Sequence, residues 1–157
     1  MKTFFQIIFV ICLAILQISL VSKISLFGVK PNMVLAGMPA LFYWGSFWEI
    51  LPAVLIGGLF YDLTDFYIGS YLVPFLLTFL IIWLLNKKYI SSSNFLTLGI
   101  LATIIFNLLY LGFGYLFGKD GFFDYFLSWR HLLEIIINGT LAVVLGLIVS
   151  FLKNRRL

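Results

Sequence analysis

The chain has 157 residues, of which 63% are hydrophobic and only 10% charged, and its formal net charge is +4. A typical soluble domain is about 25% charged and about 45–50% apolar, so this chain has too few charged residues to cover a water-exposed surface. The composition indicates one integral membrane domain over residues 1–157. Cys12 is the only cysteine, which excludes a disulfide or a cysteine metal site within the chain.

The first apolar run covers residues 4–22, directly after Met1, Lys2 and Thr3. A cleaved signal peptide has an apolar core of about 7–15 residues followed by a small-x-small cleavage site. This run is longer, and the sequence LVSKIS that follows is a poor cleavage site. The pattern therefore predicts a first helix that is retained.

Three further runs, at 67–86, 95–117 and 131–152, are close to the roughly 20 apolar residues that a helix needs to cross a bilayer. The stretch 31–61 would measure about 46 Å as one helix, well beyond a hydrocarbon core of about 30 Å. Proline inside a helix kinks or breaks it, and this stretch contains Pro39 and Pro52. We therefore expect two shorter helices, 32–45 and 49–62, that turn near WGSFWEI and could be re-entrant.

The predicted fold is thus an all-α membrane protein with about six transmembrane helices. Basic residues concentrate in cytoplasmic loops, which predicts that the segments NKKY and KNRRL face the cytoplasm. With six spans the N-terminus is cytoplasmic too, although five spans with an external N-terminus satisfy the charge rule about equally well. Both arrangements put the same four acids on the outer side: Asp62, Asp65, Asp120 and Asp124. The basic residues lie between apolar runs and at the C-terminus, and they do not alternate with aromatic residues on a polar surface. Nucleic acid is therefore not an expected partner.

Two groups of ionisable residues are candidates for a catalytic site. His131 is the only histidine, and without cysteine or a second histidine it does not make a metal site of standard ligand number. Arg130 and Glu134 are one turn apart and can pair on a helix face, so we expect an interfacial charge cluster there, with a functional pair of His131 and Glu134 as the less favoured interpretation.

Asp62 and Asp65 would share a helix face, yet acid–base chemistry needs a further positioned partner that the sequence does not offer. The favoured interpretation of Asp62 is a solvated helix end, and a structural or partner-binding role is the alternative because ionisable groups at membrane depth usually serve function. We expect neither an enzyme nor a cofactor.

Small residues predict close helix packing. Gly57 and Gly58 precede Asp62, while Ala142 and Gly146 form a small-xxx-small pair in the last predicted helix. Such residues let helix backbones approach one another in a membrane. Packing within the chain is the default interpretation, and an interface with another protein is the alternative.

Three segments together resemble the MreD family of bacterial rod shape-determining proteins. They are GVKPNMVLA at 28–36, IGGLFYDLTDFYIGS at 56–70, and IINGTLAVVLGLIVSFLKNRR at 136–156. The candidate residues for partner binding or packing in these segments are Pro31, Asn32, Gly57, Gly58, Asp62, Gly69, Asn138 and Gly139. Pro31 suits the first turn of a helix, and Asn32 can bond free backbone groups beside it.

The resemblance implies a non-enzymatic scaffold of the cell-elongation machinery in the bacterial inner membrane. Its implied partners are MreC, a cell-wall glycan polymerase and transpeptidase, and the actin-like MreB through the complex. The implied fold is similar to that of substrate-binding subunits of energy-coupling-factor transporters. A transporter subunit that binds a vitamin-type molecule is therefore the alternative, with Asn107, Tyr110, Asp62, His131 and Asn138 as candidate pocket residues.

Overall fold

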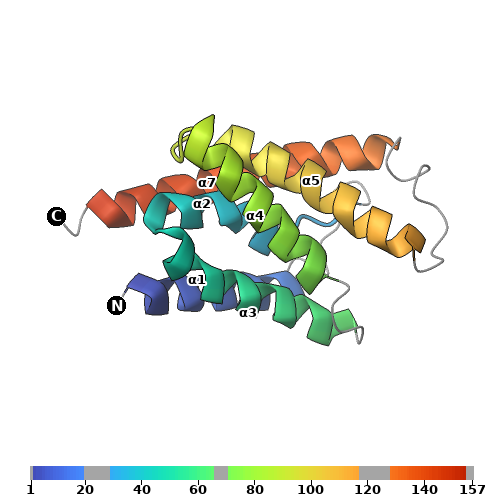
Figure 1. The fold of residues 1–157 in the computed structure, drawn as a ribbon, viewed down its shortest axis with the longest axis horizontal. Helices are drawn as coiled ribbons and strands as arrows, with labels where there is room; N and C mark the ends of the chain where they lie inside the picture. Colours follow the sequence, from blue (N-terminus) through green and yellow to red (C-terminus); the bar gives the residue numbers. More distant parts are fainter. Residues whose placement is uncertain (1, 20–28, 66–70, 117–127, 155–157) are drawn as a thin grey trace.

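The computed structural model describes residues 2–19, 29–65, 71–116 and 128–154. These residues are almost entirely helical, as the apolar runs predict (Figure 1). Within the described part of the chain there are six helices: α1 (Lys2–Ser19), α2 (Met33–Trp44), α3 (Phe47–Asp65), α4 (Leu72–Lys88), α5 (Phe95–Leu116) and α7 (Trp129–Asn154).

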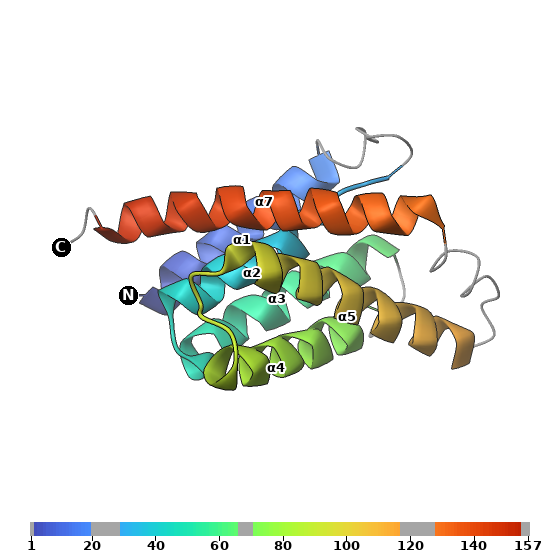
Figure 2. The ribbon, with the colours of Figure 1, turned by 90° about the horizontal axis from the view of Figure 1, so that it is seen from above.

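The helices run back and forth along one long axis, so that the bundle has two ends (Figures 1 and 2). The start of α1, the α2–α3 turn, the α4–α5 turn and the end of α7 lie at one end, which we call the proximal end. The end of α3, the start of α4, the end of α5 and the start of α7 lie at the other, the distal end, and the start of α2 lies inside the bundle on the side toward it. Each helix therefore runs from one end toward the other.

Helix α2 is the centre of the bundle. It contacts α1, α3, α4, α5 and α7, and it is buried without interruption from Val34 to Phe42. A helix that is apolar all round is one that neighbours surround, and between Met33 and Trp44 the only polar group on an α2 side chain is the Tyr43 hydroxyl. Its 12 residues extend only about 18 Å, so the start of α2 lies inside the bundle rather than at its surface.

The predicted division of residues 31–61 into two helices is confirmed, and the chain turns within WGSFWEI, as predicted, rather than at either proline. Pro39 lies within α2 and Pro52 within α3. The chain turns at Gly45 and Ser46, where a Glu49 carboxylate oxygen accepts a hydrogen bond of 2.8 Å from the Ser46 backbone N–H. The turn is thus stabilised by a side-chain acceptor three residues after Ser46.

The other predicted boundaries agree with the helices to within two residues wherever the chain is described. The predicted run 67–86 corresponds to α4, which begins at Leu72, and residues 66–70 are outside the described part. By length and composition, α5 over Phe95–Tyr115 and α7 over Trp129–Asn154 could cross a membrane. The described chain is therefore an all-helical bundle with two long apolar helices at its side.

Glycines bring α5 and α7 together. A Cβ built at Gly99 would lie 2.5 Å from the Cβ of Ala142, and one built at Gly146 would overlap the ring of Phe95. Real Cβ atoms do not come this close to their neighbours, so each contact depends on the absence of a side chain. The proximal half of the α5–α7 interface is accordingly a close approach of two backbones, the kind of packing that membrane helices use.

Candidate functional site

Buried polar side chains gather in the distal half of the bundle. On α7 they follow a helical spacing, because His131, Glu134 and Asn138 all belong to its buried face. Further along the same face the residues are small, beginning with Gly139 and Ala142. The buried face of α7 is therefore polar near the distal end and small and apolar toward the proximal end.

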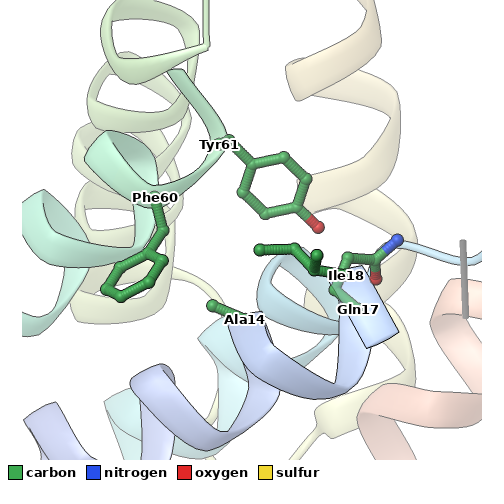
Figure 3. Close-up of a pocket in the computed structure, with 5 residues that line it drawn as sticks. All are labelled: Ala14, Gln17, Ile18, Phe60 and Tyr61. Atoms are coloured by element: carbon green, nitrogen blue, oxygen red, sulfur yellow. The ribbon is translucent and has the colours of Figure 1, made fainter. Parts of the chain in front are cut away.

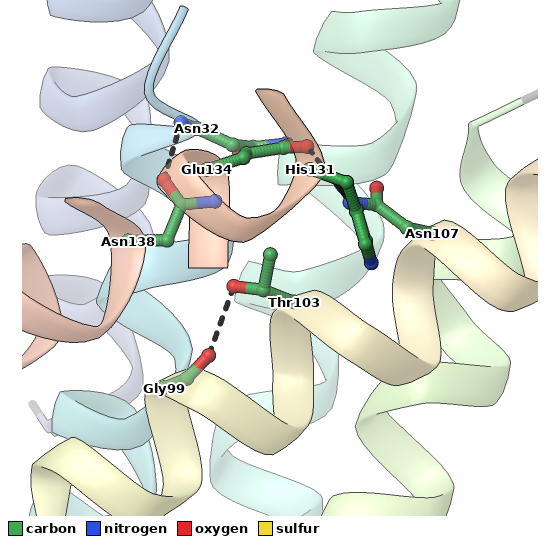
Figure 4. Close-up of polar contacts among 7 residues, drawn as sticks. All are labelled: Asn32, Gly99, Thr103, Asn107, His131, Glu134 and Asn138. Atoms are coloured by element: carbon green, nitrogen blue, oxygen red, sulfur yellow. Dashed lines mark hydrogen bonds and ion pairs between the residues drawn. The ribbon is translucent and has the colours of Figure 1, made fainter. Parts of the chain in front are cut away.

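Asn107 of α5 connects to two of these residues (Figure 4). Its Nδ2 donates a hydrogen bond of 2.8 Å to Glu134 Oε2 and lies 3.2 Å from His131 Nδ1. The same His131 nitrogen is 4.0 Å from the Glu134 carboxylate. All three side chains are buried, and Glu134 is only 8% exposed. A charge-assisted bond of this kind is stronger than a neutral one, so this contact links α5 to α7 firmly.

The start of α2 is held by side chains from two other helices. The backbone N–H of Asn32 donates to Asn138 Oδ1 of α7 at 2.8 Å, and that of Met33 donates to Gln17 Oε1 of α1 at 2.7 Å. Asn32 itself is the N-cap, since its Oδ1 accepts from the Leu35 N–H at 2.9 Å. The first N–H groups of a helix have no partner within the helix, and here they find partners inside the bundle.

Helices α3 and α4 join the same set of contacts. Tyr61 of α3 donates its hydroxyl to Asn32 Oδ1 at 2.9 Å. Asp62 Oδ1 accepts from the backbone N–H groups of Tyr71 and Leu72, at 2.7 and 3.3 Å, and so caps the start of α4 from another helix. The Tyr110 hydroxyl of α5 donates to that of Tyr71 at 3.2 Å, and the two rings stack 4.6 Å apart.

These contacts close a ring, which passes from α2 to α7, α5, α4, α3 and back to α2, with α1 attached through Gln17. We call it the polar ring and define it by its side chains: Gln17, Asn32, Tyr61, Asp62, Tyr71, Asn107, Tyr110, His131, Glu134 and Asn138. Its members bond one another across helices, so the arrangement fixes the positions of the helices relative to one another. In membrane proteins an interhelical hydrogen bond contributes about 0.6 kcal/mol on average, and the ring has several.

Two expectations from the sequence are wrong at this site. Asp62 is not a solvated helix end: its side chain is 1% exposed, and α3 continues three residues beyond it. His131 and Glu134 do not form an interfacial cluster with Arg130, because both are buried while Arg130 is exposed. In each case the polar side chain turns inward, where an N–H group or an amide from another helix is available.

The other candidate residues have separate places. We expected Pro31 in the first turn of α2, and this is wrong. Pro31 is buried, but it precedes the N-cap Asn32 and so lies outside the helix. A Cβ on Gly57 would meet Val10 and Val34, and one on Gly58 would lie 3.1 Å from the backbone Cα of Leu72.

Gly139 faces Ile100 of α5, at 3.0 Å from a built Cβ. Gly69, Asp120 and Asp124 are outside the described residues, as is the side chain of Asp65. The glycines thus lie beside the polar ring rather than in it.

Sequence reasoning missed Gln17, Tyr61 and Tyr71. Spacing carried a usable signal for α5 and α7, because Thr103, Asn107 and Tyr110 share a face of one helix, as His131, Glu134 and Asn138 do of the other. For Gln17 the signal was only a polar residue near the end of an apolar run.

A small pocket opens beside the ring, between α1 and α3 (Figure 3). Its cavity volume is only about 10 Å³, and it is lined by Ala14, Gln17, Ile18, Phe60 and Tyr61. Pockets for small molecules usually measure about 300–1,000 Å³, so this one is small for a ligand of vitamin size.

Among the described residues, no group of three or more His, Cys, Asp or Glu side chains is placed to hold a metal ion. In comparisons with models of protein families, with curated proteins and with solved structures, nothing matches this chain. The polar ring is therefore interpreted from its own geometry.

Proposed function

We propose that this protein is a non-enzymatic membrane scaffold of the bacterial cell-elongation machinery, which binds MreC and the cell-wall glycan polymerase and transpeptidase. The observation that supports a scaffold is the polar ring. Its buried and half-buried groups bond one another across five helices, and that pairing favours a rigid platform over a site that converts a substrate. The choice of machinery rests on the sequence resemblance to the MreD family at residues 28–36, 56–70 and 136–156.

We propose further that all six helices cross the inner membrane, with both termini in the cytoplasm. The up-and-down course of the helices supports this, as does an apolar outer face: along α7, Leu132, Ile136, Leu147 and Phe151 are all exposed. Lys87, Lys88 and Lys153 are exposed at the proximal end, and basic residues favour the cytoplasmic side. The short α2 is compatible with a span because the other helices surround it.

Orientation is tested with single cysteines in intact cells. Cys12→Ser removes the native thiol, and a cysteine is then placed at Lys88 or at Arg130, which are exposed at opposite ends. A thiol reagent that does not cross the inner membrane should label the Arg130→Cys protein and leave the Lys88→Cys protein unlabelled until the cells are opened. The reverse pattern would refute the proposed orientation.

Function is tested by depletion and co-purification. Depleting the protein should turn rod-shaped cells round, and the tagged protein should recover MreC from solubilised membranes. Depleted cells that express the Ile136→Leu variant are the control. This change lies on the exposed face of α7 and keeps an apolar side chain of similar size, so these cells should stay rod-shaped and the variant should recover MreC. Cells that stay rod-shaped on depletion, together with a failure to recover MreC, would refute the scaffold.

A transporter subunit remains the second candidate, and the convergence of Asn107, His131 and Glu134 is the observation that favours it. The small volume of the pocket beside the ring does not support a vitamin-sized ligand. Impaired uptake of a vitamin in depleted cells that keep their rod shape would favour this candidate over the scaffold.

A further inference from the structure

Only one of the two polar atoms of the Asn138 side-chain amide has a hydrogen-bond partner among the described residues. Asn138 is completely buried. Its Oδ1 accepts from the Asn32 backbone N–H, and that contact settles the orientation of the amide, since a backbone N–H can only donate. Nδ2 then has no hydrogen-bond partner within the described residues. A buried amide donor without an acceptor is costly, and native proteins nearly always satisfy such groups.

The register of α5 against α7 locates what Nδ2 faces. Gly99 of α5 lies against Asn138 and Ala142, while Asn107, two turns further along α5, bonds Glu134. The two helices run in opposite directions, so Thr103, halfway between, lies beside the turn from Glu134 to Asn138 (Figure 4). Thr103 is buried, and its hydroxyl donates to the Gly99 carbonyl at 2.9 Å. Its oxygen lone pairs therefore remain as acceptors.

We propose that an internal water molecule binds between Asn138, Thr103 and Glu134. It accepts a hydrogen bond from Asn138 Nδ2 and donates to Thr103 Oγ1 and to the Glu134 carboxylate, which can accept several hydrogen bonds. Buried waters typically make about three such bonds to groups that lack a protein partner. The ligand is water rather than a cation because the Asn138 amide presents N–H donors to the site, and these repel a positive ion.

The first test is an experimental structure of the full chain in a lipid nanodisc at a resolution that shows ordered water. The expected result is a water at hydrogen-bond distance from Asn138 Nδ2 and Thr103 Oγ1. A direct bond between Asn138 Nδ2 and a protein oxygen would overturn the proposal, as would an ion at metal–oxygen distances.

The second test measures coupling in a double-mutant cycle, with reversible unfolding in mixed micelles as the readout. Thr103→Val and Asn138→Ala each remove one side of the water site. Because a bridging water links them, the two changes should couple by several-fold in the unfolding equilibrium constant.

Thr78→Val is the matched control. Thr78 is also fully buried and also donates to a carbonyl four residues earlier, but it lies on α4. It should combine with Asn138→Ala additively. Additive behaviour of Thr103→Val with Asn138→Ala would overturn the proposal, and the structure of the unaltered protein decides the matter should Asn138→Ala fail to fold.

Discussion

The contact of Gly99 with Ala142 offers a sharp test of the packing between α5 and α7. In Gly99→Ala the new methyl would lie 2.5 Å from the Ala142 Cβ and 3.3 Å from the Gly139 Cα. These atoms belong to the backbone of α7 or are attached directly to it, so no side-chain rotation relieves the overlap. The two helices must move apart, and the close contacts on either side of Gly99 are weakened as well.

The expected magnitude follows from a comparison with Gly112→Ala, also on α5. Nothing lies within 4 Å of a Cβ built at Gly112. Both changes gain the same helix propensity, about 1 kcal/mol for glycine to alanine, so their difference isolates the overlap. Overpacking in a tight interior costs about 1–3 kcal/mol. We therefore expect Gly99→Ala to be about 1–3 kcal/mol less stable than Gly112→Ala.

The assay is equilibrium unfolding of the purified protein in mixed micelles, followed by circular dichroism. Ala142→Gly supplies the rescue, because it removes the atom that the new methyl meets. The double variant Gly99→Ala/Ala142→Gly should therefore show a favourable coupling energy, of the order of 0.5–3 kcal/mol as measured for residues in contact. Equal stabilities of Gly99→Ala and Gly112→Ala, or a coupling energy of zero, would refute the close approach of the two helices.

Three further predictions concern the distal half. Gly58→Leu should destabilise the bundle by about 1–3 kcal/mol and reduce MreC recovery, because the new side chain meets the backbone of Leu72; unchanged stability in the same unfolding assay would contradict this. Asp62→Asn, which keeps an acceptor for the start of α4, should cost less than Asp62→Leu, which removes the acceptor of two partly buried N–H groups at about 1–3 kcal/mol each; equal unfolding energies would show that Asp62 does not cap α4. Asn107→Leu should cost about 1–3 kcal/mol, because it removes a hydrogen-bond donor from the buried Glu134 carboxylate. It should cost much less in a chain that also carries Glu134→Leu, where this bond is already absent; a full cost in both backgrounds, measured by thermal unfolding, would exclude the Asn107–Glu134 contact.

The helices could be predicted because their signal is local. An apolar run of about 20 residues predicts a helix and its approximate ends. The run over 95–117 corresponds to α5 to within one residue. The length of residues 31–61 likewise required a break. What length could not show is that α2 is short because it is central, since that depends on which helices surround it.

The polar ring could be predicted only in part. The shared face of His131, Glu134 and Asn138 can be read from spacing along one helix, but their partners cannot. Asn32 and Asn138 are 106 positions apart, and their contact exists only because the start of α2 lies against α7. The prediction for Asp62 is wrong for the same reason. In the sequence Asp62 lies beside polar residues and resembles a helix end, but in the fold its carboxylate accepts a hydrogen bond from the start of α4.

The α5–α7 interface changes character along its length, and the two parts act by different means. In the proximal half, Gly99 and Ala142 give close apolar contact, and a slip of one helix along the other would bring a residue with a side chain into the place of Gly99. In the distal half, a slip of one turn, about 5.4 Å, would break the 2.8 Å bond between Asn107 and Glu134. In the proposed membrane location, lipid offers little hydrophobic preference between one helix contact and another. The small residues and the polar ring therefore favour the same register, the first by close apolar contact and the second by hydrogen bonding.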